Sequence, residues 1–419
     1  MPAAGAPPGP RGPGGAARGA GPHPRVHRPA GRGRSGRRLG RLAGRREGEP
    51  GPDLPFEPDR VAALLPTGGT TGLPKAVPVT HRQLHLMCLA FAVHLEEPAP
   101  PRYICATPMT HAAGMMCLAV LGQGGTVVVH DGVDPEAVLG SIERNRASSL
   151  FLPPTALYKL LGEPRVRERD LSSLRHVLIA GAPLAPDRLA QAVEVFGPVM
   201  AQSFGQAEAP MMCTVHGAAE VAAAAADPAL RHRLASCGRS SVVARVAIMG
   251  EDGALLGPGE HGEIVVRSGL VTAGYWEDPE ASAQTARPGG WYGTGDIGMR
   301  DDDGFVYIVD RKRDLIISGG FNVFPSEVEA FLHTLPGVGD CAVIGLPDPR
   351  WGESVTAVVE PRPGAVVDAD ALVAACRAHL GPVKAPKTVI FRDLPRSGVG
   401  KVLKRSLRDE YWATASRRI

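Results

Sequence analysis

The sequence predicts an α/β protein with a large domain of parallel strands and helices, a β-rich subdomain that closes it, and a small α+β domain at the C-terminus. In the first half, short apolar runs rich in β-branched residues alternate with stretches of helical length, which is typical of parallel strands joined by crossover helices. From about residue 236 the pattern shifts to strands and turns. After Arg311 helices and strands alternate again in a compact unit.

The clearest strand–helix–strand unit lies between residues 125 and 154. "GTVVVH" (125–130) and "ASSLFLPP" (147–154) are expected to be strands. The stretch between them, "DPEAVLGSIERN" (134–145), is expected to be a helix because Asp134 can cap it and Pro135 suits its first turn. "LRHVLIAGAPL" (174–184) supplies the next strand.

The second half predicts the two remaining parts of the molecule. Its expected elements are strands in "VVARVAIMGEDGALL" (242–256), "GEIVVRSG" (262–269), "GFVYIVDRKR" (304–313), "DCAVIGLPD" (340–348) and "SVTAVVEPRP" (354–363), and helices in "SEVEAFLHTLPGV" (326–338) and "DADALVAACRAHL" (368–380). We place a hinge near Arg311 to Asp314, with one domain at 51–312 and another at 313–419.

Composition excludes several classes of protein. At 419 residues, with 44% hydrophobic and 21% charged residues, the chain fits a soluble protein of two or three domains. Its seven cysteines show no CxxC pair or Cys/His metal spacing, so we expect buried thiols in a reducing cytoplasm. The longest apolar run, "LHLMCLAFAVHL" (84–95), is shorter than the roughly 18 residues that a bilayer requires. We expect neither stable membrane association nor nucleic-acid binding by the folded part.

Residues 1–50 differ in amino-acid composition from the rest of the chain. They are almost wholly Gly, Pro, Ala and Arg, with eleven Arg and no Lys. Such a segment buries too little apolar surface to offset chain entropy, so we expect disorder. One alternative is a basic arm that touches nucleic acid or anionic lipid. We prefer a mis-called start or shifted frame in GC-rich coding, which an N-terminal peptide map of the expressed protein would test.

A Gly/Thr loop, "PTGGTTGLPKAV" (66–77), is the first candidate site. Its glycines allow close backbone approach to a ligand, its threonines add hydroxyl donors and Lys75 adds a positive charge, which suits a polyphosphate. The loop is not a P-loop, because no Ser or Thr follows the lysine. Taken alone, it is equally consistent with a flexible turn.

Four further segments each carry a charged side chain that could contact a ligand. Glu208 follows an apolar run in "SFGQAEAP", and Asp296 lies between glycines in "WYGTGDIG", where it suits ribose hydroxyls. Arg311 ends the run "VYIVDR", and Lys401 follows a Gly-rich turn in "PRSGVGKVLKRSLR". In isolation, each has an ordinary structural explanation as a solvated charge or turn.

Together these segments resemble the AMP-forming acyl-CoA synthetase and adenylate-forming ligase superfamily. Six blocks occur in family order over residues 66–408, namely "PTGGTTGLPKAV", "PMTHAAGMM", "SFGQAEAP", "WYGTGDIG", "DRKRDLIISGGFNVFPSEVE" and "PRSGVGKVLKRSLR". The resemblance implies a large adenylate-forming domain and a small mobile C-terminal domain. It also implies activation of a carboxylate by ATP, release of pyrophosphate, and transfer of the acyl group to a thiol.

The resemblance assigns roles by position. Catalysis would rest on Lys401, Glu208, Thr70 and Lys75, with Glu208 organising Mg²⁺. The residues that would bind ATP or AMP are Thr67, Gly68, Gly69, Thr70, Thr71, Gly72, Lys75, Gly181, Ala182, Phe204, Gly205, Asp296 and Arg311. Arg313 would be the hinge residue, and His111 and Gly181 would border the acyl pocket. The coenzyme A channel would include Ser318, Gly319, Gly320 and Phe321.

The sequence departs from the family pattern in places. Ala207 stands where a Thr or Ser precedes the glutamate, Arg313 where Asp or Lys is usual, and Ala76 where Gly is usual. The family also has a subdomain ahead of the phosphate loop, of which only residues 52–66 are candidates here. We expect its loss to expose apolar surface and lower solubility.

These features predict an ATP-dependent acid–thiol ligase that uses ATP, Mg²⁺ and coenzyme A. The apolar stretch "HAAGMMCLAV" favours a fatty, alicyclic or aryl acid. Two alternatives stay open, a truncated remnant that only binds nucleotide and an enzyme that loads a carrier protein. The sequence also leaves a homodimer open.

Overall fold

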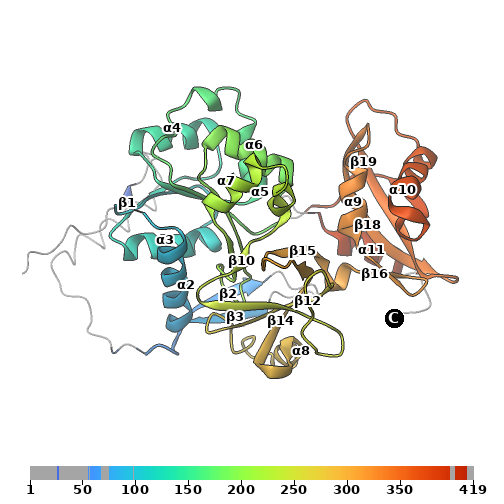
Figure 1. The fold of residues 1–419 in the computed structure, drawn as a ribbon, viewed down its shortest axis with the longest axis horizontal. Coiled ribbons are helices and arrows are strands. Elements are labelled where there is room, and N and C mark those ends of the chain that lie inside the picture. The colour runs from blue at the N-terminus through green and yellow to red at the C-terminus, as the bar shows by residue number, and fades with distance from the viewer. Residues whose placement is uncertain are drawn as a thin grey trace, which may run out of the picture.

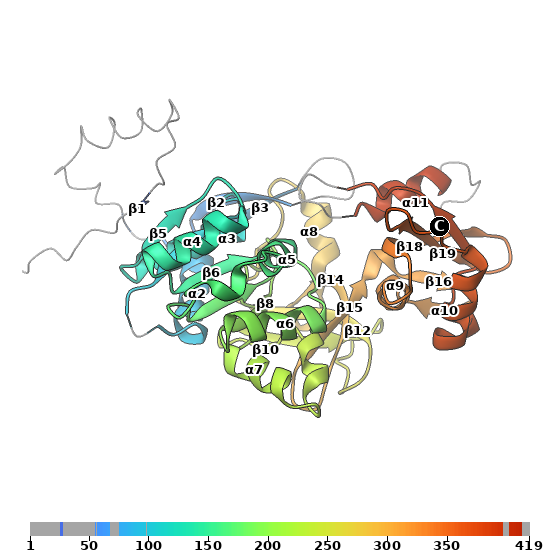
Figure 2. The ribbon, with the colours of Figure 1, turned by 90° about the horizontal axis from the view of Figure 1, so that it is seen from above.

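The chain folds into a larger unit and a smaller C-terminal unit that lies beside it (Figures 1 and 2). The computed structural model describes residues 55, 57–67, 75–97, 99–396 and 402–412, and the backbone of Val26–His27. Helices combine with mixed parallel and antiparallel sheets, so the predicted α/β class is confirmed. The expected tail at 1–50 lies outside the described residues, except for that backbone pair.

An eight-stranded sheet forms the centre of the larger unit. Its order is β1-β5-β4-β6-β7-β8-β9-β10, parallel from β1 to β8 and antiparallel from β8 to β10. The strands are β1 (Val26–His27), β4 (Arg102–Cys105), β5 (Thr126–Val129), β6 (Ser149–Leu152), β7 (His176–Ile179), β8 (Met200–Phe204), β9 (Thr214–His216) and β10 (Arg239–Ser240).

Helices cover both faces of this sheet, which explains why its strands are almost continuously apolar. One core cluster lies under α2 (His81–His94) and α3 (Ala112–Gly122). The other face packs on α4 (Pro135–Asn145), α5 (Pro154–Leu161), α6 (Pro186–Phe196) and α7 (Ala218–Ala226). The predicted cap of α4 is confirmed, because Asp134 accepts a hydrogen bond from the Ala137 N–H at 2.8 Å.

A five-stranded antiparallel sheet and a hairpin lie below the central sheet in Figure 1. Their elements are β2 (Val61–Thr67), β3 (Lys75–Thr80), β11 (Ala244–Met249), β12 (Gly262–Ser268), β13 (Ala286–Arg287), β14 (Trp291–Arg300), β15 (Val306–Arg311) and α8 (Pro279–Thr285). Four short 3₁₀ turns are described: Val166–Glu168, Arg231–Ala235, Pro288–Gly290 and Lys312–Asp314. The hairpin joins the rest of the unit through the Trp276 N–H, which donates to the Ala76 carbonyl at 2.8 Å.

The C-terminal unit consists of another five-stranded sheet with helices. Its elements are β16 (Ile316–Ser318), β17 (Phe321–Val323), α9 (Pro325–Leu332), β18 (Val338–Asp348), β19 (Gly352–Pro361), α10 (Ala369–Lys384), β20 (Thr388–Phe391) and α11 (Lys404–Trp412). The helix predicted at 326–338 is too long, since α9 ends at Leu332. Pro336 has no N–H to continue a helix, so the chain leaves α9 through a tight turn before β18.

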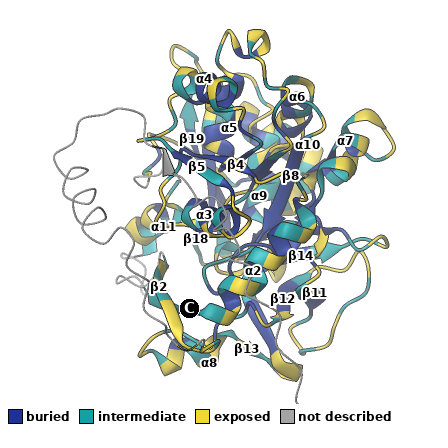
Figure 3. Ribbon diagram, turned by 90° about the vertical axis from the view of Figure 1, so that its left-hand side faces the viewer, coloured by how far each residue is buried: buried dark blue, intermediate teal, exposed yellow. Residues whose placement is uncertain are grey.

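Burial follows these layers. Figure 3 shows buried residues concentrated on the strands and exposed residues on the outer sides of helices and in loops. All seven cysteines are free thiols that are buried or half-buried, and burial raises the pKa of the Cys213 thiol to about 12. Among the helices in the described ranges, none is long and apolar enough to cross a bilayer.

Candidate active site

The predicted phosphate loop follows β2 and precedes β3 in the sequence. Thr67 ends β2 and Lys75 begins β3; the two residues pair across the ladder, and the Thr67 hydroxyl donates to the Lys75 carbonyl at 3.3 Å. The loop residues between them that the sequence singled out lie outside the described residues; they are Gly68, Gly69, Thr70, Thr71 and Gly72. The structure therefore shows the anchored ends of this loop, with both ends half-buried.

Glu208 lies in the loop between β8 and β9. Gly205 is required there, because a Cβ on it would lie 2.3 Å from the carbonyl oxygen of Met211. Met211 and Met212 adopt positive φ values of 53° and 27°, which is uncommon for side chains of this kind and concentrates strain beside the glutamate. Glu208 is only 9% exposed, so its carboxylate needs partners.

Tyr275 is such a partner, and the sequence analysis did not predict it as a site residue. Its hydroxyl donates to Glu208 Oε1 at 2.8 Å, and the Lys75 ammonium lies 4.7 Å from the centre of its ring. Burial and the charge of Glu208 raise the pKa of the Tyr275 phenol well above its usual range. Tyr275 thus connects the anchored end of the phosphate loop to the glutamate. The sequence feature that could have indicated Tyr275 is its position after Gly274 in a chain with few aromatic residues.

Asp296 and Arg311 meet because β14 and β15 pair in that register. Arg311 Nε lies 3.1 Å from Asp296 Oδ1, with the aspartate side chain 5% exposed and the arginine 45% exposed. The Gln206 amide donates to Asp296 Oδ2 at 2.8 Å and to the Thr294 carbonyl at 3.0 Å. Gln206 is two residues from Glu208, so the turn after β8 also holds the predicted ribose site. The sequence analysis missed Gln206.

Glu263 on β12 stabilises the segments that carry Asp296 and Arg311. It accepts hydrogen bonds from Arg287 and Lys312, and from the backbone N–H of Gly295 at 3.1 Å. Burial opposes its ionisation, but Arg287 and Lys312 outweigh that effect and hold its pKa below the ordinary value. One carboxylate therefore ties the residue before Asp296 to the residue after Arg311.

The residues expected to border the acid and the nucleotide lie at or after the carboxyl ends of β4, β7 and β8. Gly181 has a φ of 89°, and Ala182 beside it is exposed. Phe204 is 8% exposed and packs in a core cluster of the β-rich part, so its ring is largely covered. His111 lies at the start of α3, is exposed, and its Nδ1 is 2.9 Å from the Thr110 hydroxyl.

The predicted hinge and the predicted coenzyme A segment lie at and after the end of β15. Arg313 belongs to the 3₁₀ turn Lys312–Asp314, and Arg408 of α11 donates to its carbonyl at 2.9 Å. Ser318 is buried at the end of β16, whereas Phe321 is 60% exposed. Gly319 and Gly320 have φ values of 61° and 82°, as a tight turn requires.

Lys401 lies outside the described residues, but the start of α11 that follows it is anchored. Lys404 Nζ is 2.7 Å from Glu329 Oε1, and the Val343 N–H donates to the same carboxylate at 2.6 Å. Burial raises the pKa of Glu329. These contacts fix the chain three residues after the predicted catalytic lysine.

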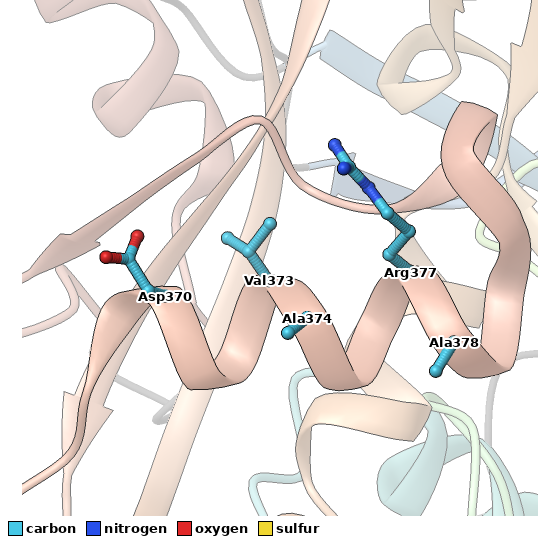
Figure 4. A pocket seen from close by; sticks show the side chains of 5 residues that line it. All are labelled: Asp370, Val373, Ala374, Arg377 and Ala378. Atoms are coloured by element: carbon cyan, nitrogen blue, oxygen red, sulfur yellow. The ribbon is translucent and has the colours of Figure 1, made fainter.

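A shallow hollow on the C-terminal unit is separate from these residues. Figure 4 shows its lining along α10, with Asp370, Val373, Arg377 and two alanines on one side of the helix. None of these residues belongs to the segments described above, so we assign it no role in the site.

The comparisons with known proteins decide the family. Residues 25–276 match the sequence model of the AMP-binding enzyme family, and residues 327–401 match the AMP-binding enzyme C-terminal domain. The chain belongs to the AMP-binding enzyme family. The first match begins inside the segment 1–50. Together with relatives that are named as CoA ligases and synthases, these matches confirm the predicted superfamily.

Two curated relatives illustrate the similarity. A medium/long-chain-fatty-acid–CoA ligase of Mycobacterium tuberculosis is 42% identical over 375 residues, which are 88% of this chain and 64% of that protein. A feruloyl-CoA synthase of an Amycolatopsis species is also 42% identical, over 86% of this chain and 72% of its own length. The chain therefore spans about two thirds of the length of the relatives that it matches.

Solved structures agree on the fold. The amide bond synthetase McbA of Marinactinospora thermotolerans superposes with a TM-score of 0.75 at 37% identity, covering 84% of this chain and 69% of that one. ATP-bound MatB of Rhodopseudomonas palustris gives 0.76 at 31% identity, covering 85% and 69%. Within the AMP-binding fold of this chain, the described residues contain no group of three or more His, Cys, Asp or Glu side chains that would hold a metal alone.

Proposed function

We propose that this AMP-binding enzyme is an ATP-dependent acid–thiol ligase that converts an apolar carboxylic acid to an acyl adenylate and then to a coenzyme A thioester. One observation carries the proposal: two buried carboxylates close together in the fold are each held by a neighbouring side chain. Glu208 accepts a hydrogen bond from Tyr275, whose ring lies beside Lys75. Asp296 accepts one from Gln206 and forms an ion pair with Arg311. The names of the relatives, which are CoA ligases for fatty and aryl acids, favour the same reaction.

The chemistry explains why positioned charges of this kind are needed. A carboxylate is a poor electrophile, because its charge is delocalised and its oxygen is a bad leaving group. Attack of that carboxylate on the α-phosphate of ATP forms the acyl–phosphate bond and releases pyrophosphate. The sulfur of the thiol then attacks the acyl carbon, and AMP leaves. Both steps redistribute negative charge, so positioned donors and cations lower their barriers.

The described residues divide this work by position. Thr67 and Lys75 hold the ends of a loop that cradles the β- and γ-phosphates, and Lys75 adds positive charge there. Asp296 accepts from the ribose hydroxyls, and Arg311 holds it in place. Lys401 bridges the carboxylate and the α-phosphate in the first step. Removing one such charge typically lowers the rate by about 10²–10³-fold.

Magnesium fits the donor set around Glu208. This ion commonly binds through one or two carboxylates together with substrate phosphates and water. Glu208 offers Oε2, since Tyr275 donates to Oε1, and Lys75 lies against the ring of Tyr275. When bound, Mg²⁺ would neutralise charge on the phosphates.

The second step uses the hinge at Arg313. We propose that the C-terminal unit turns there, which brings the Ser318–Phe321 turn to the acyl adenylate as part of the coenzyme A channel. The exposed ring of Phe321 and the two left-handed glycines before it suit a segment that contacts a ligand. The domain boundary at 312/313 follows from this role.

Acid-dependent pyrophosphate release is the test. Fatty, aryl and alicyclic acids are offered with ATP and Mg²⁺, with the chain, Lys401→Ala, and the exposed-lysine control Lys159→Ala. We expect release for at least one acid, a loss of about 10²–10³-fold in Lys401→Ala, and no change in the control. Absence of release for every acid, with Lys401→Ala identical to the unchanged chain, supports the alternative of a nucleotide-binding remnant.

The acceptor is tested separately. Coenzyme A and a phosphopantetheinyl carrier protein are offered side by side to the enzyme after adenylation, and thioester formation is measured by mass. Coenzyme A is the expected acceptor; exclusive loading of the carrier would support the alternative assignment.

Two further measurements test the remaining proposals. Sedimentation of the same preparation measures whether the chain is a homodimer, and fractionation of cells tests the cytoplasmic location.

A further inference from the structure

The first turn of α9 is capped from the other side of the predicted hinge. A helix usually begins with a Ser, Thr, Asp or Asn whose side chain accepts a free backbone N–H. In α9 this position is held by Phe324, which has no polar side-chain atom, and Pro325 after it has no N–H. The first free N–H is that of Ser326, which donates to Oδ2 of Asp310 at 2.8 Å. Asp310 lies on β15, three residues before Arg313, so a carboxylate of the larger unit caps a helix of the C-terminal unit.

The carboxylate of Asp310 is held firmly in the capping position. Asp310 is 8% exposed, and its Oδ1 accepts the N–H of Arg311 at 2.7 Å. The Ser326 hydroxyl adds a hydrogen bond to the carbonyl of Val309, so both the backbone and the side chain of Ser326 contact β15. The negative charge of Asp310 also faces the positive end of the α9 dipole, which favours this arrangement.

The cap belongs to the helix that must move with the predicted coenzyme A turn. The strands that flank the turn share one core cluster with α9, through Ile316, Val323, Val328 and Leu332. Close-packed side chains of this kind hold the turn and α9 together as one body. A rotation at Arg313 that brings Ser318–Phe321 to the acyl adenylate therefore carries Ser326 with it. Asp310 lies before the hinge and stays with the larger unit, so the rotation separates the two partners of the cap.

The cap is closed in an arrangement that keeps the turn withdrawn. Phe321 is 60% exposed and Ile317 is 55% exposed, so the turn is not packed against the larger unit. Beside the cap, the ring of Phe324 stacks on that of His261 from the larger unit, with the ring centres 5.8 Å apart. The contacts around the start of α9 thus stabilise the arrangement in which the thiol channel is not yet assembled.

We propose that Asp310 is a positioning residue that sets the balance between the two half-reactions, because it caps α9 only while the coenzyme A turn is withdrawn. This inference rests on the proposed function, since it requires the rotation at Arg313. Loss of a helix cap corresponds to about fivefold in an equilibrium constant, with a range of about 2–30-fold. Removing the carboxylate should therefore shift the population towards the rotated arrangement by about that factor.

The test measures the two half-reactions separately, with an acid that the unchanged chain accepts. Adenylation is followed as pyrophosphate release in a single turnover, and thiol transfer as thioester formation from the enzyme-bound adenylate and coenzyme A. The variants are Asp310→Ala, which removes the cap, and Asp310→Asn, which keeps an oxygen acceptor. The control is Asp301→Ala, because Asp301 accepts the Phe305 N–H at 2.8 Å and both residues lie on the same side of the hinge.

The variants should separate the cap from a general structural effect. Asp310→Ala should raise the rate of thiol transfer relative to that of adenylation by about fivefold. Asp310→Asn should restore most of the original ratio, because Asn caps helices about as well as Asp. Asp301→Ala should leave the ratio unchanged. An unchanged ratio in Asp310→Ala, or an equal change in Asp301→Ala, would overturn the inference.

Amide hydrogen exchange keeps this inference apart from the proposed function. If no acid supports pyrophosphate release, the proposed function fails, but exchange can still be measured on the unchanged chain and the variants. In Asp310→Ala, peptides that cover Ser326 should exchange faster, and peptides that cover Ile316–Val323 more slowly, as the turn packs on the larger unit. Both changes together would support the shift between arrangements. Faster exchange at Ser326 alone, or no change at either place, would refute it.

Discussion

Replacing Tyr275 by Phe should slow adenylation without unfolding the protein. The change removes one oxygen, and with it the 2.8 Å hydrogen bond to Glu208, while the ring that faces Lys75 remains. A hydrogen bond to a charged group contributes about 1.5–3 kcal/mol, which corresponds to about 10–150-fold. Since Tyr275 is only half-buried, we expect the lower part of that range, about tenfold in kcat/KM for pyrophosphate release.

The matched control is Tyr307→Phe. Tyr307 also donates to a carboxylate, Asp301 Oδ2 at 2.9 Å, but outside the site. Titrating Mg²⁺ separates positioning of Glu208 from a general loss of structure, because Tyr275→Phe should shift the Mg²⁺ requirement and Tyr307→Phe should not. Activity of Tyr275→Phe within about twofold of the unchanged chain, or an equal loss in both variants, would refute the positioning role.

Three further predictions address the ribose site, the support below it and the second half-reaction. Gln206→Ala should raise the KM for ATP about tenfold, because Asp296 loses the hydrogen-bond donor at 2.8 Å. The KM is measured by titrating ATP at a saturating concentration of the acid, and an unchanged KM would refute the role of this hydrogen bond. The pKa of Glu263 in the folded protein lies below its ordinary value of 4.5, so the ionised carboxylate stabilises the fold above pH 4.5 and this contribution is lost as the pH falls towards the folded pKa. The free energy of unfolding in urea should therefore decrease less between pH 6 and pH 4 in Glu263→Gln than in the unchanged chain. Parallel decreases in the two proteins would contradict this prediction. Gly319→Ala should slow thioester formation more than pyrophosphate release, because the added Cβ would lie 2.7 Å from the Trp351 ring and the backbone φ of 61° strains an alanine. Equal effects on both half-reactions would argue against a role of this turn in the thiol channel.

Local sequence determined the elements of the central sheet. Short apolar runs predicted β5, β6 and β7 because those strands are buried on both faces, and Asp134 with Pro135 located the start of α4. The same reasoning overestimated α9, where Pro336 ends the helix early. Short-range preferences of this kind act over a few residues, so they can be read without knowledge of the fold.

The charged site residues could also be named from their motifs, but their supporting partners could not. Tyr275 lies 67 residues from Glu208, and Gln206 lies 90 residues from Asp296. Nothing local to any of them indicates the contact. The turn after β8, the loop after β12 and the β14–β15 register bring them together.

The sequence by itself therefore determined the class of fold, the order of the motifs and the charges offered to ATP, because these depend on residue type and spacing along the chain. Only the tertiary structure decided that Tyr275 holds Glu208 and that Gln206 holds Asp296. Which side chains share a face or a hydrogen bond across a sheet depends on strand order and register, and those are settled when distant segments pack together.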